Sequence, residues 1–467
     1  MTGQTSTPRG LNSELLALPQ LREAITAGQI TTVMLALVDV QGRLKGKAFD
    51  AVYFLRHFVD SPGEGEMCAY VLATDIEMAP LTGVELAGWQ TGFGDFRVLP
   101  DLASARLLPW RPGTALVFAA AVTPDGTDPV QVAPTAMLAQ QINLLAEAGL
   151  SVKAGLEAEF VLYRGTLAQA AGQGFQGLTP VTADNRDYSL DHPAGLVRYL
   201  QRLTEMLRRA GQPVEAVKTE SAPGQVEITF PYGDPVEAAR GHLLLKHAAR
   251  AVGERMRLLP TFMAAPATGI GSGLHLHLSL WDDADAPQMA DPDRPGELSE
   301  TGQHAIAGLL EALPVLAPLW APTVNSYKRF RRNSFAPTRY TWGRDNRTCA
   351  VRVVGHGPGL HVEVRLAGAD ANPYLALAAS VAAMRHGIET RLAPPEPVKG
   401  NSYRTTAGSP LPATLREAAD LFESSTLPGT LLGEDVVQHY ASLARAELAA
   451  HDSRVTDVEL QRGFAQT

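Results

Sequence analysis

Residues 271–279 read Gly-Ser-Gly-Leu-His-Leu-His-Leu-Ser, a glycine-rich turn that runs into an alternating segment. Successive side chains of a strand point to opposite faces of a sheet. His275, His277 and Ser279 therefore share one face, and the three intervening leucines share the other. The segment predicts a strand with a polar face and an apolar face.

Carboxylates recur in three further segments. The sequence Gly-Leu-Glu-Ala-Glu-Phe places Glu157 and Glu159 two residues apart, on the same face of a predicted strand. Glu220 and Glu227 lie on either side of a Pro-Gly turn, and Glu363 follows much later. Neighbouring carboxylates in apolar surroundings are costly unless a cation neutralises them. Oxygen ligands with one or two imidazoles suit Mg²⁺ or Mn²⁺.

Four arginines follow one another within about forty residues: Arg329, Arg347, Arg352 and Arg365. The guanidinium group is permanently charged, and its fork of donors matches carboxylate and phosphate oxygens. Several such groups directed at one place indicate an anionic substrate that carries a transferable phosphate.

Composition excludes several classes of protein. The chain has 467 residues, enough for two domains, and a formal net charge of −9, which argues against nucleic acid as its main partner. Cys68 and Cys349 lie far apart without metal-ligand spacing, which favours a reducing, cytoplasmic location. We expect no secretory signal and no membrane partner, since the apolar run 115–122 is too short to span a bilayer.

Strands and helices are mixed along the chain rather than strictly alternating, which favours the α+β class. The first dozen residues are expected to be flexible, and a domain boundary is expected near residue 130. Strands are predicted at residues 32–40, 43–49, 75–80, 92–99 and 115–122. Helices are predicted at residues 15–27, 134–149, 195–210, 235–257, 301–313, 369–391, 411–424 and 434–451.

The ordered motifs GLEAEF, ESAPGQVEI, GSGLHLHLS, NSYKRF, DNRT…R and EVR…ANPYL resemble the glutamine synthetase superfamily. The resemblance runs from about residue 20 to the C-terminus and is closest to the γ-glutamylpolyamine and γ-glutamylethanolamide synthetase-like branch. It implies a small β-grasp-like N-terminal domain over residues 1–130. It also implies a catalytic domain over residues 131–467, with a mainly antiparallel sheet and flanking helices.

The resemblance also implies a role for each motif residue. The metal nearer the amino-acid substrate would be held by Glu159, Glu220 and Glu227, and the metal on the nucleotide phosphates by Glu157, His275 and Glu363. Glutamate would contact Gly271, its α-carboxylate would pair with Arg329, and its γ-carboxylate would meet Arg365. The transferring phosphoryl group would be stabilised by Arg347 and Arg352, and the nucleotide would also contact His277 and Ser279.

Several positions depart from glutamine synthetases proper. Phe335 stands where a loop glutamate would accept a proton from ammonium, and the Phe-Asp-Gly-Ser-Ser element of the N-terminal domain is missing. Ile270 replaces an asparagine, and His361 replaces an arginine. A pocket that lacks the loop glutamate and the aspartate of the missing element favours a larger primary amine over ammonium.

Tyr188 and Trp342 are candidate walls of this amine pocket. We therefore expect an ATP-dependent glutamate–amine ligase, with Glu220 as a candidate proton acceptor. Its co-substrate would be ATP, its cofactor Mg²⁺ or Mn²⁺, and its assembly a homo-oligomer of stacked rings, a dodecamer by resemblance. The alternatives are a glutamine synthetase that uses ammonium and a catalytically silent scaffold.

Overall fold

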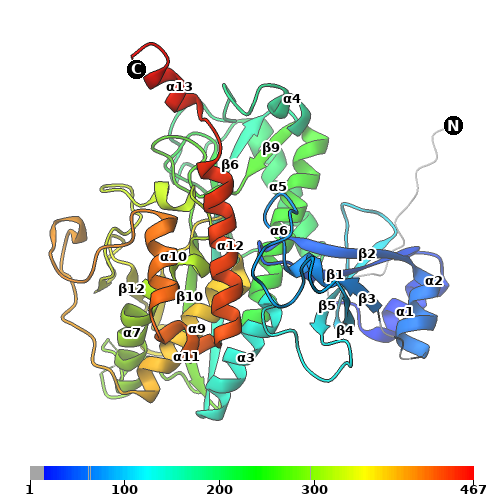
Figure 1. Cartoon of the computed structure of the whole chain (residues 1–467), viewed down its shortest axis with the longest axis horizontal. Helices are drawn as coiled ribbons and strands as arrows, with labels where there is room; N and C mark the ends of the chain where they lie inside the picture. Colours follow the sequence, from blue (N-terminus) through cyan, green and yellow to red (C-terminus); the bar gives the residue numbers. More distant parts are fainter. Residues whose placement is uncertain (1–14, 62, 64, 295, 467) are drawn as a thin grey trace.

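The computed structural model describes residues 15–61, 63, 65–294 and 296–466, and it forms two sheets with covering helices (Figure 1). The first sheet has five strands in the order β2-β1-β5-β4-β3, with β1 parallel to β5 at its centre. Its strands are β1 (Thr32–Val38), β2 (Leu44–Asp50), β3 (Gly65–Cys68), β4 (Asp95–Leu107) and β5 (Thr114–Val122). It is a mixed sheet, and the finer β-grasp-like assignment stays a prediction.

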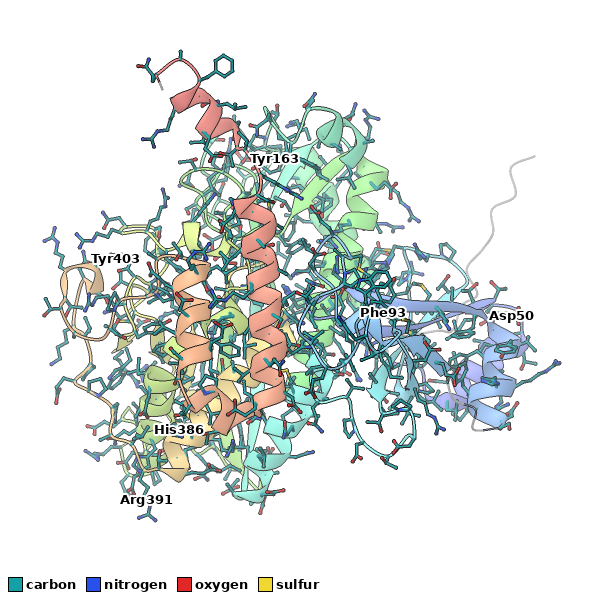
Figure 2. The ribbon with its side chains drawn as sticks, viewed as in Figure 1. Asp50, Phe93, Tyr163, His386, Arg391 and Tyr403 are labelled. Carbon is teal, nitrogen blue, oxygen red and sulfur yellow. The ribbon has the colours of Figure 1, made fainter. Side chains whose placement is uncertain are left out.

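The predicted hairpin between β1 and β2 forms. The carboxylate of Asp39 accepts hydrogen bonds from the backbone N–H groups of Gln41 and Arg43, and Gly42 takes a φ of +73°, which only glycine adopts without strain. At the far end of β2, Asp50 caps the short helix α2 (Ala51–Phe54) by accepting from the N–H groups of Val52 and Tyr53 (Figure 2).

The second sheet has eight strands and carries most of the polar motif residues. Its order is β11-β12-β13-β10-β6-β8-β7, with β9 paired to β6, and every pair except β11 and β12 is antiparallel. This confirms the α+β class and the mainly antiparallel sheet. Its strands are β6 (Leu150–Arg164), β7 (Ala216–Thr219), β8 (Gln225–Thr229), β9 (Leu258–Thr261), β10 (Leu274–Asp282), β11 (Trp342–Arg344), β12 (Val351–Val354) and β13 (His361–Val364).

Helices cover the second sheet, and α9 is buried along most of its length. The α-helices outside the first sheet's α2 are α1 (Leu18–Thr26), α3 (Pro134–Glu147), α4 (Leu167–Gly172), α5 (Ala194–Arg209), α6 (Pro235–Met256), α7 (Glu300–Ala312), α8 (Ala317–Trp320), α9 (Pro373–Glu389), α10 (Leu415–Ser424), α11 (Leu427–Leu432), α12 (Glu434–Asp452) and α13 (Asp457–Gly463). Short 3-10 or π turns are η1 (Leu55–Asp60), η2 (Ala69–Leu72), η3 (Leu313–Leu316), η4 (Ser326–Arg329), η5 (Gly357–Gly359) and η6 (Ser402–Arg404).

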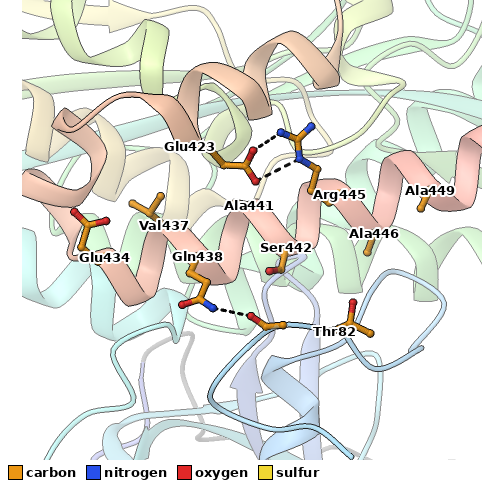
Figure 3. Close-up of a pocket in the computed structure, with 11 residues that line it drawn as sticks. Thr82, Glu423, Glu434, Val437, Gln438, Ala441, Ser442, Arg445, Ala446 and Ala449 are labelled. Atoms are coloured by element: carbon orange, nitrogen blue, oxygen red, sulfur yellow. Dashed lines mark hydrogen bonds and ion pairs between the residues drawn. The ribbon is translucent and has the colours of Figure 1, made fainter.

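Polar contacts join the region of the first sheet to the helices around the second. Asn372, the N-cap of α9, donates from its side chain to the carbonyl of Asp39 in the hairpin turn, at 3.0 Å. Gln438 on α12 donates to the carbonyl of Gly83 at 2.9 Å, and a cavity of about 620 Å³ opens beside this contact (Figure 3). This cavity lies between α12, the end of α10 and the loop that carries Thr82, and no candidate site residue lines it.

Some predicted boundaries differ from the structure. Residues 75–80 form a turn closed by an isolated bridge from Thr74 to Pro80 rather than a strand, because the Asp75 carboxylate accepts from the backbone of this segment. Strand β3 was not predicted, and α9 begins at Pro373 because Asn372 caps it. The predicted flexible arm lies outside the described residues. Within the described part of the chain, no helix is long and apolar enough to cross a membrane.

Candidate active site

The register of the second sheet gathers the polar motif residues on one face. Residues directly opposite each other in a ladder point to the same side. His275 on β10 lies opposite Glu157 on β6, and His277 lies opposite Glu363 on β13. Arg352 on β12 is also opposite Glu363. Segments that are about two hundred residues apart in sequence therefore meet on one surface.

The first group of candidate ligands consists of Glu159, Glu220 and Glu227. One oxygen of each carboxylate lies within 4.8 Å of the others. Oε2 of Glu159 accepts from the backbone N–H of Gly273 at 2.8 Å and from the side-chain amide of Gln225 at 3.0 Å. These two donors orient the carboxylate of Glu159, and the set expected for the first metal lies together.

The second group surrounds Glu157. The structure brings Glu157, His277 and Glu363 within 4.8 Å, and it also brings Glu157, Glu227 and His275 within that distance. Nδ1 of His275 lies 3.3 Å from Glu157 Oε2 and 3.5 Å from Glu363 Oε1. The set expected for the second metal therefore lies together, and His277 joins it.

The electrostatics of these groups fit a divalent cation. Burial and the nearby charge of Glu157 raise the pKa of Glu227 to about 9. Burial opposes ionisation of Glu157 as well, but the adjacent imidazoles of His275 and His277 lower its pKa. One buried acid therefore resists ionisation because its neighbours carry the same charge, and a cation would relieve this repulsion. Carboxylate oxygens with a few imidazoles suit Mg²⁺ or Mn²⁺. The residues present therefore fit the cations that we expect.

Three of the four arginines are buried beside these acids. Arg365 forms an ion pair with Glu363, and Arg352 pairs with both Glu363 and Asp345. Burial works against the ionised form of Glu363, yet Arg365 and the neighbouring histidines lower its pKa to about 2. Both guanidinium groups thus lie at the edge of the second candidate metal group.

Arg329 lies deeper, on the turn η4. Its guanidinium donates to the carbonyls of Arg365 at 3.3 Å and Leu366 at 3.1 Å, and burial lowers its pKa to about 10. The glycine turn before β10 makes room for it, because a Cβ on Gly271 would lie 3.0 Å from Arg329 Cγ and one on Gly273 would lie 2.8 Å from Nη2. Glycine at these two positions follows from the close approach of this arginine.

The rim of the site is exposed. Tyr188 is 68% exposed, and the ammonium group of Lys218 lies 4.3 Å from the centre of its ring. Lys218 itself forms an ion pair with Glu220. Phe335 is 61% exposed, with a φ of +58°, and Arg347 is exposed as well. A bulky residue in this left-handed region is strained, which is common in loops at functional sites.

The loop that carries Phe335 is held from both sides. The carbonyl of Phe335 accepts from Arg365 at 3.5 Å, and the hydroxyl of the buried Tyr403 donates to the carbonyl of Ala336 at 2.9 Å (Figure 2). The backbone of this loop is therefore tied to the arginine beside Glu363, while the ring of Phe335 faces solvent.

Two predicted site residues lie outside the two groups of candidate metal ligands. Trp342 is opposite Val351, whose side chain points away from the polar face, and its buried indole donates to the carbonyl of Pro395 at 2.7 Å. The structure does not bring it to the rim beside Tyr188. Ser279 is on the polar face but farther along β10, where it accepts from the indole N–H of Trp281 at 2.9 Å.

Sequence reasoning missed two residues of the site. Gln225 orients Glu159 and also donates to the carbonyl of Gly271 at 2.8 Å. Lys218 lies opposite Glu227 in the ladder. Each precedes a candidate ligand by two strand positions, so the alternation that placed the glutamates on one face could have found both.

The comparisons with known proteins agree with this geometry. The chain is 43% identical to the gamma-glutamylethanolamide synthetase GlnA4 of Streptomyces coelicolor over 96% of both chains. It is 33% identical to a glutamate–isopropylamine ligase of a Pseudomonas species, over 95% of this chain and 97% of that protein. A solved complex of GmaS with ADP superposes with a TM-score of 0.81 at 25% identity, over 96% of this chain and all of the other. Residues 131–463 match the glutamine synthetase catalytic domain, and the chain therefore belongs to the glutamine synthetase family.

Proposed function

We propose that this protein is an ATP-dependent glutamate–amine ligase that joins the γ-carboxylate of glutamate to a primary amine. The observation that carries the proposal is the polar face of the second sheet, where two groups of metal ligands lie beside buried arginines. Two of the relatives are named gamma-glutamylethanolamide synthetase and glutamate–isopropylamine ligase, and these names indicate ethanolamine and isopropylamine as the amines joined. Both are amines that carry carbon chains.

The first step of the proposed reaction activates glutamate. A carboxylate is a poor electrophile, so its oxygen must first become a leaving group. The γ-carboxylate takes the γ-phosphoryl group of ATP, ADP leaves, and a γ-glutamyl phosphate results. Arg365 would contact the reacting carboxylate, while Arg352 and Arg347 would balance the charge of the phosphoryl group in transit. Divalent cations would add electrostatic stabilisation of the phosphate oxygens.

The buried arginine fixes the other end of glutamate. Arg329 would pair with the α-carboxylate, next to Gly271. In the free protein Nη1 donates to the carbonyls of Arg365 and Leu366, and Nη2 also donates to that of Arg365, which leaves Nε–H and one N–H of Nη2 for a carboxylate. His277 and Ser279 lie two residues apart on one face of β10, and both would face the nucleotide.

In the second step the amine nitrogen attacks the γ-carbonyl carbon, phosphate leaves, and the nitrogen loses a proton. Glu220 would accept this proton, at the side of the site where Tyr188 and Lys218 form the rim. Glutamine synthetases proper carry a glutamate at the loop position of Phe335, where it attracts ammonium. Phe335 would instead form an apolar wall of the pocket. A carbon chain gains about 0.8 kcal/mol for each methylene that it buries there.

A coupled ADP-release assay with glutamate and a panel of amines tests the proposal, with mass spectrometry of the amide product. We expect at least one alkyl or hydroxyalkyl amine to exceed ammonium in kcat/KM by about ten-fold or more, which corresponds to about 1.4 kcal/mol. If the protein makes glutamine faster than any other γ-glutamyl amide, the proposal is wrong and the protein is a glutamine synthetase that uses ammonium. No turnover with any amine would favour the silent scaffold. A homo-oligomer of stacked rings remains part of the proposal, and particle size by light scattering would test it.

A further inference from the structure

His361 on β13 contacts His277 on β10, a neighbour that its position in the sequence does not reveal. It replaces the arginine that the family resemblance leads us to expect, two residues before Glu363. Its Nδ1 lies 2.7 Å from the backbone carbonyl of Gly359. A carbonyl oxygen only accepts hydrogen bonds, so this ring nitrogen carries the hydrogen. The neutral ring then has its lone pair on Nε2.

The lone pair of His361 faces His277. Nε2 of His361 lies 3.0 Å from Nδ1 of His277. Since one of the two atoms must donate, the hydrogen belongs to Nδ1 of His277. An arginine at position 361 has only donors and could not accept this hydrogen bond. The replacement by histidine therefore selects one tautomer of the neighbouring ring.

In the neutral ring, this tautomer leaves Nε2 of His277 with the lone pair that a metal ligand needs, and this buried atom has no hydrogen-bond partner among the described residues. Nε2 of His277 lies 3.1 Å from Oε1 of Glu157, and Glu363 completes a triad whose ligand atoms lie within 4.8 Å of one another. At this separation, either a proton on Nε2 or a metal cation bound by both atoms would relieve the repulsion between the two lone pairs. His277 is only 17% exposed at its side chain, so water does not screen the contact fully.

We propose that His277 is a direct ligand of the divalent cation held by Glu157 and Glu363, and that His361 is the positioning residue that sets its tautomer. The proposal rests on the cation requirement of the proposed function, but it adds a second imidazole beside His275 to the expected ligand set. A metal-binding histidine commonly donates its other ring N–H to a carboxylate, a backbone carbonyl or water, which fixes its tautomer and orientation, and Nε2 of His361 would be the acceptor here. Two imidazoles also favour Mn²⁺ over Mg²⁺ more strongly than one does.

A crystal structure of the Mn²⁺-soaked protein, with the ions located by anomalous scattering, tests the ligand directly. We expect an ion within about 2.4 Å of His277 Nε2, in the range of ligand distances for hard divalent cations. An ion near Glu157 with His277 more than about 3 Å away would overturn the proposal. So would the absence of an ion from the Glu157–Glu363 group at saturating Mn²⁺. These outcomes do not depend on whether the protein turns over any amine.

Mn²⁺ affinity, measured by electron paramagnetic resonance of the free ion, tests the role of His361. His361→Leu removes the acceptor, and we expect affinity at one site to fall by about 10- to 100-fold. His361→Gln can accept from His277 through its amide oxygen while its N–H₂ group faces Gly359, so it should recover much of the loss. His304→Leu is the matched control, because His304 also bonds a backbone carbonyl through Nδ1 and lies outside the site. Equal affinities in His361→Leu and wild type would overturn the positioning role.

The combined results separate this inference from the proposed function. Amide synthesis together with a His277 that does not touch the ion would reject the inference alone. A His277-bound ion in a protein that uses only ammonium, or no amine at all, would reject the proposed ligase and leave the inference standing.

Discussion

The strand face and the rim of the site differ in burial and in backbone conformation. On the strand face, His275, Glu227 and Glu363 are all at most 7% exposed, and ladder register sets their positions. On the rim, Tyr188 and Phe335 are more than 60% exposed, and both have positive φ values. Phosphoryl transfer is the same step for every amine substrate, and it needs charges in fixed positions. The choice of amine instead depends on residues that can change without disturbing the sheet. This contrast leads to four predictions.

The largest effect should come from the strand face. Glu227→Ala should reduce ADP release by about 100-fold or more, because the remaining carboxylates cannot hold a cation in place. The assay is steady-state turnover at saturating Mg²⁺ and Mn²⁺. Glu300→Ala is the control, since that carboxylate is 86% exposed and lies on α7. Near-normal turnover of Glu227→Ala would remove the strand face from the mechanism.

The second effect concerns the buried arginine. Arg329→Lys should raise the KM for glutamate by about 10- to 100-fold, because an ammonium group cannot both bond the carbonyls of Arg365 and Leu366 and form a two-pronged contact with a carboxylate. The KM for ATP should change little. The measurement is a pair of saturation curves for the two substrates. The opposite pattern would assign Arg329 to the nucleotide.

The third effect tests the rim. Phe335→Glu should shift the ratio of kcat/KM values toward ammonium by about ten-fold, because a carboxylate attracts the small cation that an exposed ring does not. Phe335→Leu keeps an apolar side chain and should leave the ratio close to that of the wild type. The ratio is measured by competition between ammonium and the best amine of the panel. An unchanged ratio in Phe335→Glu would show that the amine pocket lies elsewhere.

The smallest effect is on stability. The pKa of Glu227 is raised from 4.5 to about 9, so the folded protein holds a proton there that the unfolded chain has lost. The free energy of unfolding of the metal-free protein should therefore fall as pH rises between these values, by at most about 1.4 kcal/mol per pH unit. Urea unfolding in a chelator at pH 6, 7 and 8 measures the slope.

A matched variant identifies the group responsible. Glu227→Gln has no titrating group at this position and should show a flatter dependence on pH, and added Mn²⁺ should likewise reduce the slope in the wild type. If the slopes of Glu227→Gln and wild type coincide in the chelator, another group causes the pH dependence.

Local pattern was enough to predict several features of this protein. Alternation placed Glu157 with Glu159, and His275 with His277, on single strand faces, because the two-residue period of a strand is a property of the backbone alone. The apolar stripe of α5 and the hairpin turn at Gly42 follow from similarly local rules, and the ordered motifs identified the family. Side-chain chemistry likewise predicted oxygen and imidazole ligands for a hard divalent cation.

Contacts between distant segments needed the folded chain. Pairing of β10 with both β6 and β13 places Glu363 and Glu157 around the same two histidines, and no local pattern specifies which strands pair. The same register turns Trp342 away from the site. The contact of His361 with His277 also spans 84 residues. A strand's own sequence sets which side chains share its face, but only the packing of the whole sheet decides which faces meet.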